Sequence, residues 1–352
     1  MYELVERLEP DDLYALSRFA FAELAHCGVT AVGEFHYVHH QADGTPYENR
    51  TELAEAVVRA ALDVGIRICL LRVVYNRPGY GRTPEGAQRR FCDPDLDHAL
   101  ADIEQLRTRY ADEPKVRIGV AAHSLRAVPL PWVERAARFA EERELPFHMH
   151  VSEQRREIQE CLAEHGRRPV EVLSDAGVLS PRFVAVHATH LADREVRLLD
   201  GCFVCLCRTT ERDLGDGLAR TRDLVREGAR LCFGVDSHAL SDPFEEARAA
   251  ELDERSRTGK RAIFEAPDLL RAAGETGYAS IGMAGLAGED RVLLSARDPA
   301  LAGAVDETLD DAIVFGAAPS AVQAVSVGGR ELDIELTASQ VAFTTALDRL
   351  AR

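Results

Sequence analysis

Histidines and carboxylates recur at the ends of short apolar runs along this chain. The informative ones are His150 and Glu153 in PFHMHVSEQ, His187 at the end of FVAVH, and Asp236 in LCFGVDSH. Neutral imidazole and carboxylate are ligands that zinc and iron take, and a metal lowers the pKa of a bound water toward neutrality. A carboxylate directly after a buried strand is costly unless it is paired or metal-bound. One such histidine alone is more often a hydrogen-bonded core residue, but together these residues favour a metal-assisted hydrolytic site.

Each of these residues follows an apolar run that we predict to be a strand, with an amphipathic helix before it. The predicted strands cover 29–37, 66–75, 116–123, 146–152, 183–190, 202–210 and 231–237, and the predicted helices cover 11–26, 52–63, 94–110, 132–144, 155–176, 193–200 and 218–227. The strands are almost continuously hydrophobic, as in a parallel sheet buried on both faces. This alternation predicts either a doubly wound α/β sheet or a (β/α) barrel.

The positions of the polar residues favour the barrel. A barrel builds its active site at the C-terminal ends of its strands. The ionisable residues at predicted strand ends are Glu34, His36, Tyr37, His123, Arg126, His148, His150, Glu153, His187, His190, Asp236 and His238. A Rossmann sheet would instead show a glycine-rich phosphate loop after an early strand. Gly79, Gly81 and Gly86 lie in an irregular loop rich in arginine and proline, which does not fit that motif.

The pattern changes beyond about residue 243. A charged helical stretch at 244–258 and an alanine-rich helix at 266–273 are followed by two short strand candidates, 290–294 and 322–327, and by a final helix at 338–350. We therefore predict a barrel domain over 1–285, a small and mostly β appendage over 286–336, and a C-terminal helix over 337–352.

Composition excludes several classes of function. The formal charge of −17 argues against a nucleic-acid or anionic-membrane partner. Lys115 and Lys260 are the two lysines, and both lie among charges or beside proline, so a Schiff-base mechanism is not expected. The eight cysteines lie mostly in apolar runs and predict buried reduced thiols. No apolar run reaches the roughly 18 residues that span a bilayer, and no signal peptide is evident, so a cytoplasmic location is expected.

Six segments in this order carry a resemblance to a known family: GEFHYVHHQADGTPY, AAHSLRAV, HMHVSEQ, VHATHL, TTERDLGDG and GVDSH. They resemble the amidohydrolase superfamily, specifically its formimidoylglutamate deiminase branch, from Met1 to about Arg330. The resemblance implies a distorted (β/α)8 TIM-type barrel with a small β domain. It also implies hydrolysis of an amidine C–N bond with release of ammonia.

The resemblance assigns roles to individual residues. One divalent ion, zinc or iron, would be bound by an H-x-H motif on the first strand together with His150 and Asp236. Glu153 would shuttle protons, His187 would polarise or hold the attacking water, and Asp236 would also accept its proton. The substrate-contacting positions match Tyr37, His123 and Arg126. The Arg126 guanidinium suits a substrate carboxylate because it can bind two oxygens at once.

The chain departs from the family pattern in two places. No H-x-H precedes the first predicted strand, and the chain begins at Met1-Tyr2, which the family places after that motif. We therefore expect a barrel without its first strand and a metal left with His150, His187 and Asp236. An internal start codon and a truncated, repurposed homologue both account for this. The second departure is Arg208, where the family has proline; a cation there could alter substrate choice.

Three expectations for function follow. The resemblance implies hydrolysis of N-formimidoyl-L-glutamate to N-formylglutamate and ammonia, a step of histidine degradation, by a homodimer acting on a small anionic amidine. A deaminase or hydrolase of another small amidine, guanidine or N-heterocycle is the first alternative. The second is a metal-free, non-catalytic homologue acting as a binding subunit. His39 and His40 would belong to a substrate loop by the resemblance, or to a solvated polar loop.

Overall fold

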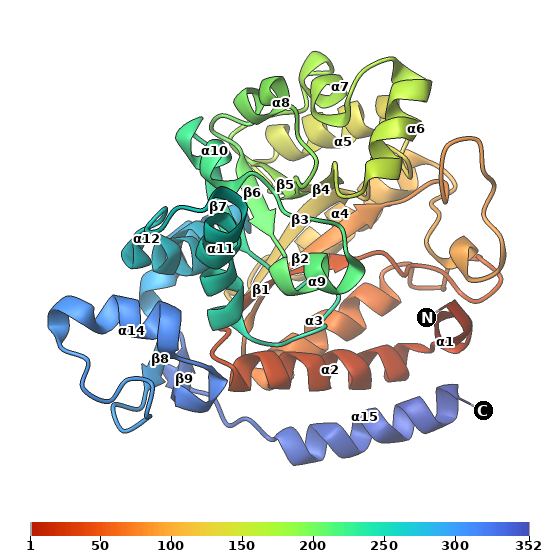
Figure 1. Cartoon of the computed structure of the whole chain (residues 1–352). Helices are drawn as coiled ribbons and strands as arrows, with labels where there is room; N and C mark the ends of the chain where they lie inside the picture. Colours follow the sequence, from red (N-terminus) through yellow and green to blue (C-terminus); the bar gives the residue numbers. More distant parts are fainter. Residues whose placement is uncertain (1, 352) are drawn as a thin grey trace. The chain divides into compact units, whose positions relative to one another are not determined.

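Seven parallel strands, hydrogen-bonded in chain order from β1 to β7, form the main sheet of the computed structural model, which describes residues 2–351 (Figure 1). The strands are β1 (Ala31–His36), β2 (Arg67–Val74), β3 (Val116–Ala122), β4 (Phe147–Val151), β5 (Phe183–His187), β6 (Phe203–Leu206) and β7 (Arg230–Phe233). A helix follows nearly every strand, so the prediction of an α/β, barrel-type sheet is confirmed. The chain divides into two compact units, which are described separately.

The first unit comprises Met1–Ala25, Ala31–His148 and Leu332–Arg352. Its helices are α1 (Tyr2–Arg7), α2 (Pro10–His26), the 3₁₀ turn η1 (Gly86–Arg90), α3 (Glu52–Val64), α4 (Leu96–Arg109), α5 (Leu130–Glu142) and α15 (Leu336–Leu350). All eight residues of β2 are buried, as expected for a strand paired with β1 on one side and β3 on the other. Helix α3 ends at Gly65, whose φ of 97° is the left-handed conformation that glycine adopts most easily.

Helices α2 and α15 lie side by side in this unit (Figure 1). The rings of Phe19 and Phe343 are 4.6 Å apart, and Arg18 Nη1 donates to Ser339 Oγ at 3.0 Å. Arg349 Nε donates to the buried Asp12 carboxylate at 2.8 Å. The C-terminal helix, predicted over 338–350, is thus a partner of the N-terminal helix.

The second unit comprises His26–Thr30 and Met149–Glu331. Its helices and helical turns are α6 (Arg155–His165), α7 (Pro169–Asp175), α8 (Asp193–Leu198), α9 (Arg208–Leu214), α10 (Thr221–Arg226), α11 (Pro243–Thr258), α12 (Ala266–Arg271), the π-helical turn η2 (Ala272–Thr276), α13 (Gly277–Ser280), η3 (Ala284–Glu289), η4 (Asp306–Thr308), α14 (Leu309–Gly316) and η5 (Pro319–Ala321). A small antiparallel sheet contains β8 (Arg291–Leu294), β9 (Val322–Val327) and β10 (Arg330–Glu331) in the order β10-β9-β8. Helix α14 was not predicted in this mostly β segment.

Two predicted elements differ from the structure in this unit. The helix predicted over 155–176 is two helices, because Gly166 at φ 69° ends α6 and Pro169 begins α7. The strand predicted over 202–210 stops at Leu206, and α9 begins at Arg208. The Glu246 carboxylate of α11 accepts the backbone N–H groups of Arg208 and Thr209, at 2.6 and 3.1 Å, and so satisfies the first turn of α9.

Candidate active site

The second unit brings together polar residues from the ends of three strands. His150 lies in β4, Glu153 follows it, His187 is the last residue of β5, and Asp236 follows β7. His187 and Asp236 both have positive φ, 69° and 46°, a conformation that costs a non-glycine residue on the order of 1–3 kcal/mol. Such strain persists where surrounding structure enforces it, and it is concentrated at functional sites.

The same strain marks the surroundings of these two residues. Seven non-glycine residues in the described part of the chain have positive φ, and five of them lie at or beside these strand ends. The five are Ser152, His187, Ala188, Asp236 and His238. Backbone hydrogen bonds fix the turns, since Ala188 N donates to Val151 O at 3.1 Å and His190 N donates to Ser152 O at 2.9 Å.

His187 is the centre of this arrangement. Its fully buried imidazole donates from Nδ1 to Glu211 Oε1 at 3.3 Å. Its Nε2 lies 3.6 Å from Asp236 Oδ2 and 3.8 Å from Glu153 Oε1. Burial lowers the pKa of His187, but the three carboxylates outweigh it and raise that pKa above its usual value. The His150 ring stacks nearly parallel to the His187 ring, with centroids 5.4 Å apart.

Glu211 is a functional candidate that the sequence patterns did not single out. It is fully buried, and its Oε1 accepts the Cys207 backbone N–H at 3.0 Å as well as the His187 ring. Burial raises the pKa of Glu211, but His187, Arg208 and the Cys207 N–H overcome this and lower it, so the carboxylate stays ionised. Glu211 lies in the TTERDLGDG segment, but the sequence did not show that it faces His187. Its position depends on the turn into α9, which the distant Glu246 stabilises.

Arg208 is a buried partner of Glu211. Its side chain is fully buried, with Nη1 donating to Glu211 Oε2 at 3.0 Å and Nη2 donating to Thr221 Oγ1 at 2.5 Å. Its Nε lies 3.7 Å from Asp253 Oδ2. A guanidinium held in this way neutralises and positions Glu211, so any influence of Arg208 on substrate choice would act through Glu211.

These residues fit a divalent cation. His187 Nε2 is buried without a hydrogen-bond partner, and it faces carboxylates whose negative charge a cation would neutralise. Two ligand atoms about 2.0–2.1 Å from a tetrahedral ion lie about 3.3–3.4 Å apart, close to the 3.6 Å between His187 Nε2 and Asp236 Oδ2. A histidine ligand commonly donates its other ring N–H to a carboxylate, as His187 does to Glu211.

A third ligand atom lies close to this pair. Cys207 Sγ, His187 and Asp236 each offer one ligand atom, and all three atoms lie within 4.8 Å of one another. The hydrogen bond with Cys205 lowers the pKa of the Cys207 thiol, but burial and nearby carboxylates outweigh it and raise that pKa to about 12. His150, expected as a ligand, is outside this group and stays a predicted ligand.

The first unit holds the three predicted substrate-contacting residues. The ring centroids of Tyr37 and His123 are 5.8 Å apart, and those of Tyr75 and His123 are 4.7 Å apart, so these side chains form an aromatic cluster. Burial, followed by the charge of Arg126, lowers the pKa of His123, so its ring is neutral. Arg77 Nε donates to the Arg126 backbone oxygen at 3.1 Å and holds that loop. These aromatic rings lie near the positive charge of Arg126.

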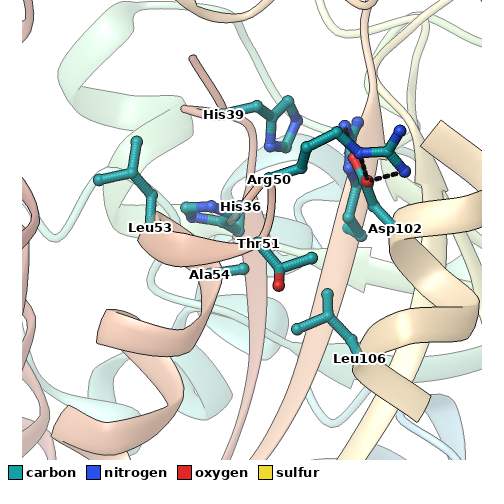
Figure 2. Close-up of a pocket in the computed structure, with 9 residues that line it drawn as sticks. His36, His39, Arg50, Thr51, Leu53, Ala54, Asp102 and Leu106 are labelled. Atoms are coloured by element: carbon teal, nitrogen blue, oxygen red, sulfur yellow. Dashed lines mark hydrogen bonds and ion pairs between the residues drawn. The ribbon is translucent and has the colours of Figure 1, made fainter. Parts of the chain in front are cut away.

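His39 and His40 are not in a solvated loop. Both are buried, and both backbone N–H groups donate to Arg90 O, at 2.8 and 3.0 Å. Figure 2 shows His39 and His36 in a pocket beside Arg50 and Asp102. These histidines are therefore buried core residues that flank Tyr37 in the chain.

Parallel strands with imidazole and carboxylate groups at their ends define a hydrolase of the amidohydrolase class, and the chain belongs to the amidohydrolase family, whose profile matches residues 1–331. It is a hydrolytic C–N enzyme. It is 34% identical over 345 residues to formimidoylglutamate deiminase from Pseudomonas aeruginosa, covering 94% of this chain and 76% of that protein. It is 27% identical over 370 residues to 5'-deoxyadenosine deaminase from Methanoregula boonei, covering 100% and 76%.

Solved structures give the same picture. An amidohydrolase from Brucella melitensis superposes with a TM-score of 0.92 and 30% identity, covering all of this chain and 82% of that one. An adenosine deaminase from Xanthomonas campestris with bound zinc superposes with a TM-score of 0.82 at 21% identity, covering 98% and 76%, and so supports the fold. Metal binding is typical of the family. Among the described helices, none has the length and apolar character needed to cross a membrane.

Proposed function

We propose that this chain hydrolyses the amidine C–N bond of N-formimidoyl-L-glutamate or a closely similar anionic amidine, with release of ammonia, as a step of histidine degradation. The observation that carries the proposal is the buried His187 imidazole set among Glu153, Glu211 and Asp236. The similarity to formimidoylglutamate deiminase supports this choice of substrate. The homodimer stays a prediction.

His187, Asp236 and His150 are the proposed holders of one zinc or iron ion. When bound, the ion polarises a water molecule and lowers its pKa toward neutrality. The protein side chains then move protons. As the water oxygen bonds to the amidine carbon and becomes the carbonyl oxygen, one of its protons passes to the Asp236 carboxylate and the other to Glu153. Both protons are then delivered to the nitrogen, whose bond to the carbon breaks so that it leaves as ammonia. Glu211 accepts the Nδ1–H of His187 and so orients the imidazole with Nε2 toward the ion.

Arg126, in the first unit, suits this substrate. Arg126 is the proposed partner of a substrate carboxylate, since a guanidinium pairs with both carboxylate oxygens. The Arg126→Met variant should raise KM for the anionic amidine by about 10–100-fold, the equivalent of the 1.5–3 kcal/mol that a charge-assisted hydrogen bond contributes, with a smaller change in kcat. A loss confined to kcat would contradict a binding role.

A heterocyclic amidine is the second candidate substrate. The observation that favours it is the aromatic cluster of Tyr37, Tyr75 and His123, whose faces could stack on a flat ring. The similarity to 5'-deoxyadenosine deaminase over the whole chain agrees with it.

Ammonia release tests the two candidates directly. The full chain, loaded with zinc or iron(II), is assayed with N-formimidoyl-L-glutamate and with 5'-deoxyadenosine. We expect turnover of the first that is abolished in His187→Ala and Glu153→Gln. Turnover of the nucleoside alone would replace the proposed substrate. A chain that binds no metal and releases no ammonia from either compound would support a non-catalytic binding subunit.

A further inference from the structure

We propose that Cys207 supplies a thiolate ligand to the cation held by His187 and Asp236. The inference rests on the proposed metal-dependent function and adds a sulfur donor to its metal site. His187 is the last residue of β5, Cys207 directly follows β6, and Asp236 lies three residues after the end of β7. Their ligand atoms lie within 4.8 Å of one another, and His187 Nε2 is buried without a hydrogen-bond partner.

Glu211 fixes two of these ligands with one oxygen. Its Oε1 accepts the Cys207 backbone N–H at 3.0 Å and the His187 ring Nδ1–H at 3.3 Å. Its Oε2 accepts Arg208 Nη1 at 3.0 Å, which keeps the carboxylate in place. A carboxylate that orients a ligand from outside the coordination shell is typical of metal sites. Here the same carboxylate holds the backbone of the cysteine and the ring of the histidine.

Gly234 leaves the space that the sulfur atoms occupy. A Cβ added at Gly234 would lie 3.2 Å from both Cys205 Sγ and Cys207 Sγ, closer than side-chain atoms normally pack. The Cys205 thiol hydrogen-bonds with the thiols of Cys207 and Cys232, so three thiols lie together. Among the described residues, Cys207 alone of these three belongs to the group with His187 and Asp236. Cys205 is therefore a matched control.

The donor set favours particular metals. A thiolate with imidazole and carboxylate suits zinc or cobalt, whereas magnesium and calcium prefer oxygen ligands alone. Ligation requires the Cys207 thiol to lose its proton to solvent as the sulfur–metal bond forms, so metal binding releases a proton. Cys207 would then be a metal ligand, whereas its apolar surroundings in the sequence predict a buried thiol of the core.

X-ray absorption spectroscopy of the zinc-loaded full chain tests the proposal. We expect a sulfur scatterer at about 2.3 Å in addition to nitrogen and oxygen at about 2.0–2.1 Å. The sulfur scatterer should disappear in Cys207→Ser and remain in Cys205→Ser. The cobalt(II) form should show a near-ultraviolet thiolate-to-metal absorption band that follows the same pattern. Zinc affinity of Cys207→Ser should fall by at least the roughly 10–100-fold that loss of an outer-shell partner costs.

The outcomes separate this proposal from the proposed function. One equivalent of zinc bound through His187 without a sulfur scatterer would overturn the role of Cys207 and leave the hydrolase intact. A sulfur signal that survives in Cys207→Ser and disappears in Cys205→Ser would assign a different thiol and equally overturn it. If the wild-type chain binds no zinc, both the Cys207 ligand and the proposed metal-dependent function would be overturned. Where Cys207→Ser fails to fold, Cys207→Ala is a second variant, and loss of the sulfur signal in Cys205→Ser would by itself overturn the proposal.

Discussion

The Nδ1 atom of His187 lies 3.3 Å from Oε1 of Glu211, and both side chains are completely buried. A carboxylate can only accept at this contact, so Nδ1 carries a proton, and in the neutral ring the Nε2 lone pair faces Asp236 and Glu153. By occupying Nδ1, Glu211 leaves Nε2 as the ring nitrogen available to a cation or a water molecule.

Replacing Glu211 by Gln should lower both stability and metal affinity. The amide leaves the buried Arg208 guanidinium without its ionised partner, which costs about 3 kcal/mol or more. Urea unfolding measures the free energy of unfolding, and zinc titration measures the affinity. Glu245→Gln is the matched control, because its ion pair with Arg212 is partly exposed to solvent, whereas Glu211 and Arg208 are fully buried, and pairs of this kind contribute about 1 kcal/mol. An E211Q variant as stable as wild type would contradict the role of Glu211.

The buried ion pairs of the first unit predict a second large effect. Arg72 donates to both oxygens of Asp93, at 2.9 and 2.6 Å, and to Asp102 at 2.8 Å. Asp93→Ala removes one partner of a buried charge and should lower the free energy of unfolding by about 3–5 kcal/mol. Asp95→Ala, on the exposed His98 pair, should change it by less than about 2 kcal/mol, since Asp95 also caps α4. Equal effects of the two variants on chemical denaturation would show that the cluster is not stabilising.

His36 should make the protein less stable in acid. Burial, followed by the charge of Arg72, lowers the pKa of His36 from 6.5 to about 3, so the folded chain keeps this ring neutral. Between these two values the unfolded chain takes up a proton and the folded chain does not. The stabilisation is present above pH 6.5 and is lost as the pH falls toward 3, at about 1.4 kcal/mol per pH unit.

Urea unfolding at several pH values, with wild type and His36→Gln side by side, isolates this contribution. The variant is needed because burial raises the pKa of Glu246 to about 7, and that group favours the folded state in acid instead. We expect the variant to lose stability less steeply than wild type below about pH 6.5. Parallel curves would mean that His36 is protonated in the folded chain.

Gly119 should tolerate no side chain. A Cβ there would lie 2.6 Å from Leu71 Cδ2 and 2.9 Å from Pro146 Cγ, inside the buried sheet of the first unit. Gly119→Ala should therefore lower the melting temperature, with an overpacking cost of about 1–3 kcal/mol. Gly285→Ala is the control, because nothing lies within 4 Å of the added Cβ. A Gly119→Ala protein that melts like wild type would show that Leu71 can move aside.

The sequence predicted the alternation of strands and helices and the strand-end position of His187 and Asp236, because buried parallel strands and their helices leave a periodic pattern that is local. The end of β6 could not be predicted in the same way. CLCRTTERD looks like a continuing strand, and the carboxylate that starts α9 instead comes from Glu246, 38 residues after Arg208. The solvated loop considered for His39 and His40 was wrong for the same reason, since the carbonyl that accepts their backbone N–H groups belongs to Arg90, 50 residues after His40. Gly166 and Pro169 were readable signals of a helix break.

The pairing of α2 with α15 has a consequence for how the first unit is made. Arg18 and Ser339, which are hydrogen-bonded, stand 321 residues apart. During synthesis α2 emerges early, and the face that carries Phe19 stays without its partner until Phe343 has been added. Contacts between segments so distant form late and slow the search for the native state. Until then the uncovered apolar face is a surface on which the growing chain can aggregate.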